Sequence, residues 1–284
     1  MEHNQLLQTT QSDLVRVQDR PLRVMFVKTF MPVGGAETLL VELIRRLDRQ
    51  RFAPELCLLK ERGPLGEQLA DEIPTHANLL TSKWDVRVLA RLVKLLRQRQ
   101  IDAIVTVGAG DKMFWGRLAG RLAGVPVIAS ALHSTGWPDG VGRLNRLLTP
   151  ITDAFIAVAP SHGDFLTRFE KFPGEKVVVI PNGVDTGRFS PVPDGDKVRR
   201  ELGLTSTAPV VSIVAALRPE KNHEMFLQVA AKIRRRVSDA QFLVVGDGPC
   251  RAALEDLAEE LALTDCVHFL GPRGDIPRLL TVTD

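Results

Sequence analysis

The chain has 284 residues, of which 44% are hydrophobic and 25% charged, a composition typical of globular proteins that excludes disordered and collagen-like chains. No segment reaches the roughly 18 consecutive apolar residues of a membrane span, and residues 1–20 lack the apolar core of a signal peptide. The balance of 37 Lys and Arg against 34 Asp and Glu gives a net charge of +3, which is too small to indicate a nucleic-acid partner.

Residues 22–186 alternate short apolar strands with amphipathic helices. The strands are predicted at 23–28, 54–59, 102–107, 125–131, 154–158 and 177–180, and the helices at 37–47, 86–99, 112–123 and from about 161. Strands that alternate with helices favour a parallel sheet covered on both faces. The right-handed connections of such a sheet give a Rossmann-like layer, preceded here by a flexible tail at 1–21.

Residues 187–208 are rich in Pro, Gly and Asp and are interpreted as a connection that contains a short helix at 196–202. The alternating pattern then restarts in a second domain at 209–284. Its strands are predicted at 210–217, 241–245 and 266–270, and its helices at 223–237, 249–261 and from 276. A doubly wound nucleotide-binding sheet usually has about six strands, so we expect residues 1–284 to be a fragment of a longer chain or an incomplete gene product.

The three cysteines, Cys57, Cys250 and Cys266, are an odd number with no CxxC pair, which disfavours a disulfide framework and a zinc site. A reducing cytoplasm is the simplest interpretation.

Paired glycines mark the turn between the first predicted strand and helix. Gly34 and Gly35 would let the backbone approach a ligand, and the helix N-terminus that follows offers free N–H groups to an anion. The alternative is a tight structural turn in which Glu37 complements the helix dipole.

Two cations follow the first strand of the second domain. Arg218 and Lys221 would suit a diphosphate, with a planar fork and a point charge respectively, although a lone RxxK motif is more often a solvated pair of charges in a loop. Asn222 could cap the next helix without contacting a ligand. Gly246 and Gly248 form a second turn after a strand, which serves a ligand or the fold alone.

One histidine and one basic helix complete the candidates. His133 ends the strand VPVIASALH and could contact a hydroxyl or a phosphate, or be a structural histidine. The helix at 86–99 carries Arg87, Arg91, Lys94 and Arg97 on one side, a pattern that suits either an outer helix of the sheet or peripheral contact with anionic lipid. The chain has no GxSxG, HExxH or Walker motif.

Taken in order, these segments resemble the family 4 glycosyltransferases, which are retaining enzymes of the two-domain GT-B fold. The resemblance covers nearly everything from about residue 22 onward and rests on GGAE at 34–37, His133, PNGVD at 181–185 with Phe189, AALRPEKNHE at 215–224, VVGDGP at 244–249, and VHFLG at 267–271 with Asp284.

The resemblance implies an α/β chain of two Rossmann-like domains, the second incomplete. The first domain would hold most of the acceptor site, and the second would bind a nucleotide-sugar donor without a metal or other cofactor. It implies catalytic roles for His133, Arg218 and Lys221, with Arg218 and Lys221 neutralising the departing diphosphate. Donor contacts are implied for Gly34, Gly35, Glu37, Asn182, Gly246 and Gly248. The acceptor would be a glycan, a lipid-linked sugar or a small molecule, and the enzyme would be cytoplasmic or peripheral at the inner membrane face.

The family also carries two glutamates, eight positions apart, that position the donor further on than Asp284. We therefore expect weak donor binding and little turnover from residues 1–284 alone. Two alternatives remain open at this point. One is a non-catalytic nucleotide or nucleotide-sugar binding module or inactive remnant, and the other is a GT-B nucleotide-sugar epimerase.

Overall fold

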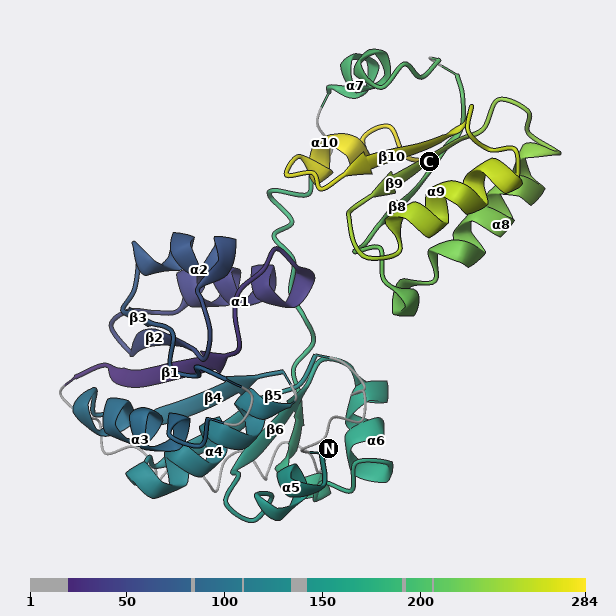
Figure 1. Cartoon of the computed structure of the whole chain (residues 1–284). Coiled ribbons are helices and arrows are strands. Elements are labelled where there is room, and N and C mark those ends of the chain that lie inside the picture. Colours follow the sequence, from purple (N-terminus) through teal and green to yellow (C-terminus); the bar gives the residue numbers. More distant parts are fainter. Residues whose placement is uncertain (1–19, 83–84, 109, 134–141, 191–192, 206) are drawn as a thin grey trace, which may run out of the picture. The chain divides into compact units, whose positions relative to one another are not determined.

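The computed structural model describes residues 20–82, 85–108, 110–133, 142–190, 193–205 and 207–284. The chain divides into two compact units, Met1–Gly183 and Val184–Asp284. Of the expected flexible tail at 1–21, residues 1–19 lie outside the described residues. Both units are α/β, and every strand pair in each is parallel, which confirms the predicted fold class (Figure 1).

The first unit is built on a seven-stranded sheet with the order β3-β2-β1-β4-β5-β6-β7. The strands are β1 (Leu22–Lys28), β2 (Phe52–Leu58), β3 (Thr75–His76), β4 (Ala103–Val107), β5 (Val127–Ala131), β6 (Ala154–Ala157) and β7 (Val177–Val179). Because all these strands run in one direction, their carboxyl ends lie along one edge of the sheet, where ligands bind in open α/β folds.

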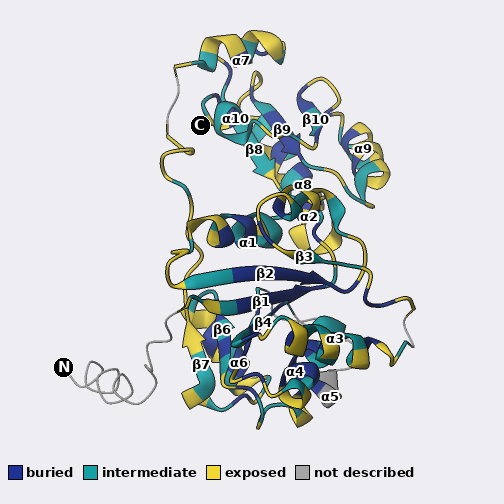
Figure 2. Ribbon diagram, turned by 90° about the vertical axis from the view of Figure 1, so that its left-hand side faces the viewer, coloured by how far each residue is buried: buried dark blue, intermediate teal, exposed yellow. Residues whose placement is uncertain are grey.

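Helices cover both faces of this sheet. They are α1 (Gly35–Arg46), α2 (Gly63–Ala70), α3 (Val88–Gln98), α4 (Asp111–Ala123), α5 (Gly142–Leu147) and α6 (Pro160–Arg168), with a 3₁₀ turn η1 (Gly174–Lys176). Alternate residues of β1 serve the two faces, as the twofold period of a strand requires. Val24 and Phe26 pack in one core with α1 and α2, whereas Met25 and Val27 pack in another with α3 and α4. The central strands are correspondingly buried (Figure 2).

The second unit has a three-stranded sheet in the order β10-β9-β8. Its elements are α7 (Gly195–Glu201), β8 (Val210–Val214), η2 (Pro219–Lys221), α8 (His223–Arg234), β9 (Gln241–Val245), α9 (Arg251–Glu260), β10 (Val267–Gly271) and α10 (Ile276–Leu280). The central strand again divides its side chains by face. Phe242 and Val244 pack in the core that includes α8 and α9, and Leu243 and Val245 pack with α7 and α10.

The predicted connection at 187–208 contains an element that packs onto the second unit. Val198 of α7 is 2% exposed and shares a core with Val210 and Leu279. The guanidinium of Arg278 on α10 pairs with Asp194 and, at 3.0 Å, with Glu201. Apolar burial and a charge network thus fix α7 to the three-stranded sheet.

Candidate functional site

The carboxyl end of β8 carries the two cations predicted from the sequence. Arg218 precedes the turn η2, and Lys221 ends it immediately before Asn222 and α8. Both side chains are exposed. Within the described residues, no hydrogen bond or ion pair engages either charged group. Two uncommitted cations beside a helix N-terminus are well placed for an anion.

The glycine turn after β9 holds this cationic loop in place. Leu217 donates its N–H to the carbonyl of Asp247 at 3.0 Å, and Cys250 donates to the carbonyl of Leu217 at 3.1 Å. A Cβ on Gly248 would lie 2.5 Å from the Leu217 carbonyl oxygen, and one on Gly246 would overlap the Ala215 carbonyl oxygen. The two glycines are therefore required by the close approach of two backbone segments, a structural role that exists whether or not they also contact a ligand.

The residues that start α8 are unusual. Asn222 has a φ of 52° and occupies the cap position, but its side chain makes no capping hydrogen bond. His223 is 2% exposed, and neither ring nitrogen has a hydrogen-bond partner within the described part of the chain. Burial, together with the nearby charge of Lys221, lowers the pKa of His223 below its ordinary value. The imidazole is therefore neutral at neutral pH.

The corresponding edge of the first unit holds Gly34, Gly35 and Glu37. Gly34 is the cap residue of α1 in extended conformation, and Glu37 lies in the first turn. The Glu37 carboxylate pairs at 2.8 Å with the amine of Lys28, the last residue of β1. Lys28 is only 7% exposed. Lys28 was not among the candidates predicted from sequence, although a charged residue at the end of an apolar strand is a signal for it.

His133 lies two residues beyond the end of β5, at the same edge of the sheet. Its Nδ1 is buried and has no hydrogen-bond partner within the described residues, which exclude the segment 134–141 that follows. Burial lowers the pKa of His133, and so does the charge of Lys28, whereas Glu37 acts in the opposite direction. His133 and the Lys28–Glu37 pair therefore belong to one electrostatic cluster.

Asn182 belongs to the segment that ends the first unit. It lies in the exposed segment after β7, and its side chain makes no hydrogen bond to another described residue. Three residues later, the carboxylate of Asp185 accepts hydrogen bonds at 3.0 Å from the N–H groups of Gly187 and Arg188. A local turn thus begins at Asp185, the last residue of PNGVD, close to the division between the two units.

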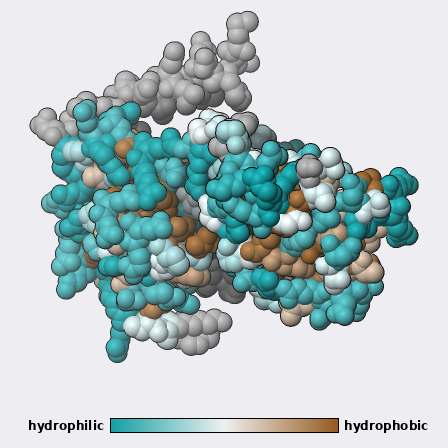
Figure 3. Space-filling model, turned by 90° about the horizontal axis from the view of Figure 1, so that it is seen from above, coloured by the Kyte–Doolittle hydropathy of each residue, from teal (hydrophilic) through white to brown (hydrophobic). Residues whose placement is uncertain are grey.

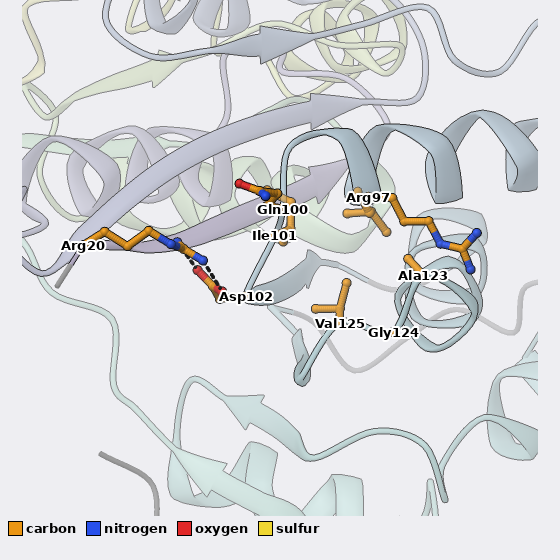
Figure 4. Close-up of a pocket in the computed structure, with 9 residues that line it drawn as sticks. Arg20, Arg97, Gln100, Ile101, Asp102, Ala123, Gly124 and Val125 are labelled. Carbon is orange, nitrogen blue, oxygen red and sulfur yellow. Dashed lines mark hydrogen bonds and ion pairs between the residues drawn. The ribbon is translucent and has the colours of Figure 1, made fainter. Parts of the chain in front are cut away.

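A hollow of about 360 Å³ lies elsewhere, at the amino ends of β4 and β5 (Figure 4). Arg20 and Asp102 form a bidentate pair on one side of it, at 2.8 and 2.9 Å. The C-terminal ends of α3 and α4 line the other side. Ligands of open α/β sheets bind at the carboxyl edge, so this hollow is not the candidate site.

The described residues show neither a metal-binding cluster nor a membrane-spanning helix. No group of three His, Cys, Asp or Glu side chains among them is placed to hold a metal ion. None of their helices is long and apolar enough to cross a membrane. The face shown in Figure 3 is hydrophilic over most of its area, with smaller apolar patches. All three cysteines are free thiols.

Two family models match the chain, one for each unit. The model described as Glycosyltransferase Family 4 matches residues 33–188, and the model described as Glycosyl transferases group 1 matches residues 194–284.

Curated relatives have related activities. The chain is 28% identical over 280 residues to the UDP-Gal:alpha-D-GlcNAc-diphosphoundecaprenol alpha-1,3-galactosyltransferase of Escherichia coli, covering 93% of this chain and 72% of the relative. It is 26% identical over 237 residues to a GDP-mannose-dependent alpha-(1-6)-phosphatidylinositol monomannoside mannosyltransferase of Mycolicibacterium smegmatis, covering 82% of this chain and 61% of the relative.

Solved structures share the fold. HepE of Anabaena in complex with UDP and glucose superposes with a TM-score of 0.78 at 21% identity, covering 93% of this chain and 73% of that chain. WaaG, a glycosyltransferase involved in lipopolysaccharide biosynthesis, gives a TM-score of 0.68 at 14% identity, covering 92% and 73%.

Proposed function

The chain belongs to glycosyltransferase family 4, and we propose that it transfers a hexose from a nucleoside diphosphate sugar with Arg218 and Lys221 as the groups that neutralise the departing diphosphate. The observation that carries this proposal is the pair of exposed, uncommitted cations at the carboxyl edge of β8. Cleavage of a sugar–phosphate bond builds negative charge on the leaving group, and fixed cations lower the energy of the transition state in which that charge develops.

The geometry of the loop supports pre-organised binding. The backbone of Leu217, directly before Arg218, is fixed to Asp247 and Cys250 by hydrogen bonds of 3.0 and 3.1 Å, so the loop starts from a fixed position. The N-terminus of the twelve-residue helix α8 follows directly and adds its dipole. A nucleoside diphosphate matches this arrangement in charge and in the number of acceptor oxygens.

The donor class has support from relatives and structural neighbours. One relative is named for UDP-Gal and another for GDP-mannose, and the neighbour HepE was solved with UDP and with UDP-glucose. We therefore propose a uridine or guanosine diphosphate hexose as donor. For the acceptor we propose a lipid-linked sugar, because the relative from Escherichia coli is named for a diphosphoundecaprenol acceptor.

In the first unit we propose that Gly34 and Gly35 contact the donor phosphates and that His133 contacts the transferred sugar. The depressed pKa of His133 keeps the imidazole neutral at neutral pH, so it can exchange hydrogen bonds with sugar hydroxyls without adding charge. Asn182 is proposed as a further donor contact, which its exposure permits.

We also propose that transfer proceeds with retention. The acceptor oxygen would attack the anomeric carbon from the face that the diphosphate leaves, while a departing phosphate oxygen takes the acceptor proton. This scheme needs positive charge on the diphosphate and no carboxylate nucleophile. The Glu37 carboxylate, which stands at the candidate edge of the first unit, is already paired with Lys28. NMR assignment of the product anomer tests retention directly.

Peripheral membrane contact through α3 is a separate proposal. α3 contains Arg91, Lys94 and Arg97, and Arg87 is its cap residue. Two of these four cations are used within the fold, because Arg91 binds Asp85 at 2.6 Å and Arg97 donates to the Leu122 carbonyl at 2.7 Å. Arg87 and Lys94 are exposed and remain for anionic headgroups. Co-sedimentation with anionic vesicles is expected to fall in an Arg87→Gln/Lys94→Gln variant, and salt-insensitive or absent binding would contradict the proposal.

The test of the transferase proposal compares the charged loop with matched cations nearby. Arg218→Ala and Lys221→Ala are each expected to lower kcat/KM for nucleoside diphosphate release from the sugar nucleotide by about 10²- to 10³-fold, the cost of losing one pre-organised charge contact. Lys232→Ala and Arg236→Ala, which remove exposed cations further along the same unit, serve as controls and should change little.

Two results would overturn the proposal. One is failure of UDP and GDP to bind the wild-type chain at millimolar concentration in calorimetry. The other is an unchanged kcat/KM in both loop variants.

Incubation with donor alone separates transfer from epimerisation, since an epimerase would change the donor sugar without any acceptor. The epimerase among the structural neighbours is 14% identical and therefore supports the shared fold only.

A further inference from the structure

Glu37 occupies a position between a buried lysine and the glycine turn. One carboxylate oxygen pairs with the Lys28 amine at 2.8 Å, and the side chains of Lys28 and Glu37 are 8% and 15% exposed. A charge this well shielded from water needs a partner, because desolvation otherwise disfavours the charged form. The pair is therefore a fixed part of the first unit's carboxyl edge.

The other carboxylate oxygen lies where Gly34 has no side chain. A Cβ added to Gly34 would overlap Oε2 of Glu37, whereas a Cβ on Gly35 would meet nothing within 4 Å. Gly34 adopts an extended conformation that any residue can take. The absence of a side chain at position 34 is thus explained by the space that the Glu37 carboxylate fills.

We propose that Lys28 and Glu37 are positioning residues that hold the Gly34–Gly35 turn for an anionic group, with Glu37 packed beneath Gly34 and neutralised by Lys28. The inference rests on the proposed function in one respect only, which is the identification of that anion as the donor diphosphate. It moves Glu37 from the substrate contacts implied by sequence to a supporting role.

Electrostatics favour this arrangement. An unpaired carboxylate in the first turn of α1 would repel an incoming phosphate at the place where the helix dipole attracts it. With its charge compensated by Lys28, Glu37 complements the dipole without opposing the ligand. A side chain larger than hydrogen at position 34 would overlap Oε2 and force the Glu37 carboxylate to shift, and the ion pair with Lys28 would have to rearrange with it.

The pKa of His133 depends on the charges of Lys28 and Glu37, so it can be used to follow the ion pair without any ligand. The charged and titratable groups that act on it are Lys28 from β1, Glu37 from α1 and His162 from α6. The start of α4 brings Asp111 and Lys112 to the same edge, where Asp111 accepts a hydrogen bond from Thr29 at 3.2 Å. Lys28 and Glu37 act on the His133 pKa in opposite directions, so a change in either one has a predictable sign.

The first experiment measures the pKa of His133 by NMR in the full chain without ligand, with the resonance assigned by a His133→Asn variant. The pKa should fall in Glu37→Gln and rise in Lys28→Met, and Lys28→Arg should restore the wild-type value. Gly34→Ala should lower the pKa as Glu37→Gln does, because it displaces the same carboxylate. Gly35→Ala is the matched control and should leave the pKa unchanged.

The second experiment is a double-mutant cycle with pyrophosphate as the probe, measured by calorimetry. Gly34→Ala and Lys28→Met are each expected to weaken pyrophosphate binding about tenfold, the value of roughly one charge-assisted hydrogen bond. The double variant should lose no more than either single variant, since both changes remove one interaction. A wild-type His133 pKa in Gly34→Ala, or additive losses in the double variant, would overturn the inference. If pyrophosphate binds no variant, wild type included, the diphosphate assignment fails while the His133 pKa series still decides the positioning role.

Discussion

The substitution Gly246→Ala gives the sharpest test of how the cationic loop is held. Gly246 has a φ of 140°, a region that side chains of L-residues rarely adopt, and its Cβ would overlap the carbonyl oxygen of Ala215. The colliding atom belongs to the backbone, so no side-chain rotation relieves it. The strained backbone alone costs about 1–3 kcal/mol, and with the collision the total is expected to reach about 3 kcal/mol or more.

This cost should appear in one unit only. For a unit of about 100 residues, a loss of about 3 kcal/mol lowers the melting temperature by about 12–24 °C. The three tryptophans, Trp84, Trp115 and Trp137, all precede the second unit, so their fluorescence follows the first unit. Cys266, which is fully buried in the second unit, becomes available to thiol reagents when that unit opens.

Thermal labelling of Cys266, resolved by peptide mass spectrometry, is therefore the assay. In Gly246→Ala the labelling midpoint should fall by the stated amount while the tryptophan midpoint stays near wild type, and affinity for UDP should fall as the Arg218 loop is displaced. Gly274→Ala is the control, because its Cβ would meet nothing within 4 Å. A Cys266 midpoint in Gly246→Ala within about 4 °C of wild type, equivalent to less than about 1 kcal/mol, would refute the argument.

Three further predictions follow from buried groups. Burial and a neighbouring lysine lower the pKa of His223 in the folded chain. As the pH falls below the ordinary histidine pKa of about 6.5, the unfolded chain therefore binds a proton that the folded chain does not, which destabilises the folded state. The urea midpoint of unfolding should drop between about pH 7.5 and about pH 5.5, and it should drop by less in His223→Leu. Arg117 is fully buried and hydrogen-bonded, and Arg117→Met should destabilise the first unit by about 3 kcal/mol in tryptophan-monitored urea unfolding, with a loss below about 1 kcal/mol contradicting its role. Cys250 should react with thiol reagents before Cys57 and Cys266 in the native chain, because burial raises the pKa of the Cys57 thiol to about 12 and excludes reagent from both buried thiols.

Much of the fold was accessible from hydrophobic patterning. The predicted strand at 23–28 and the helix at 37–47 correspond to β1 and α1, because a buried parallel strand is almost wholly apolar and a covering helix shows its stripe at helical spacing. The glycine-rich turns were equally visible, since Gly34 and Gly246 interrupt the apolar pattern at each junction.

Three elements of the first unit were not predicted from the hydrophobic pattern, and each has a physical reason. The segment of α2 (Gly63–Ala70) contains two glycines and a proline, which is the composition of a turn, and it becomes helical while packing Leu69 beside Leu58 of β2. The strand β3 (Thr75–His76) has two residues and exists through its pairing with β2. The short helix α5 (Gly142–Leu147) likewise has too few residues to show a period. Tertiary contacts, rather than local propensity, determine such elements.

The candidate site likewise contains residues that the sequence predicted and contacts that it did not. Position along the strands indicated Arg218, Lys221 and His133, because residues after a strand reach the carboxyl edge. Spacing gave no sign that Lys28 would pair with Glu37, since the lysine belongs to one element and the glutamate to the next. Pairing across elements requires the register of strand and helix in space, which composition does not contain.

Arg117 illustrates how a close approach can be recognised nonetheless. An arginine in a helix is usually exposed to solvent, but Arg117 of α4 is 0% exposed, and its guanidinium donates hydrogen bonds to Met113, Thr152 and Asn145. The neighbouring glycines explain this burial. A Cβ on Gly116 would lie 2.5 Å from Thr106 of β4, so the helix sits close to the sheet and carries the next residue inward with it. Burial lowers the pKa of Arg117 to about 10, which still lies well above neutral pH, so the group keeps its charge. A charged residue next to a helix glycine that faces the sheet is therefore a candidate for a buried, hydrogen-bonded side chain. Such a residue can be identified in the sequence once the strand order is known.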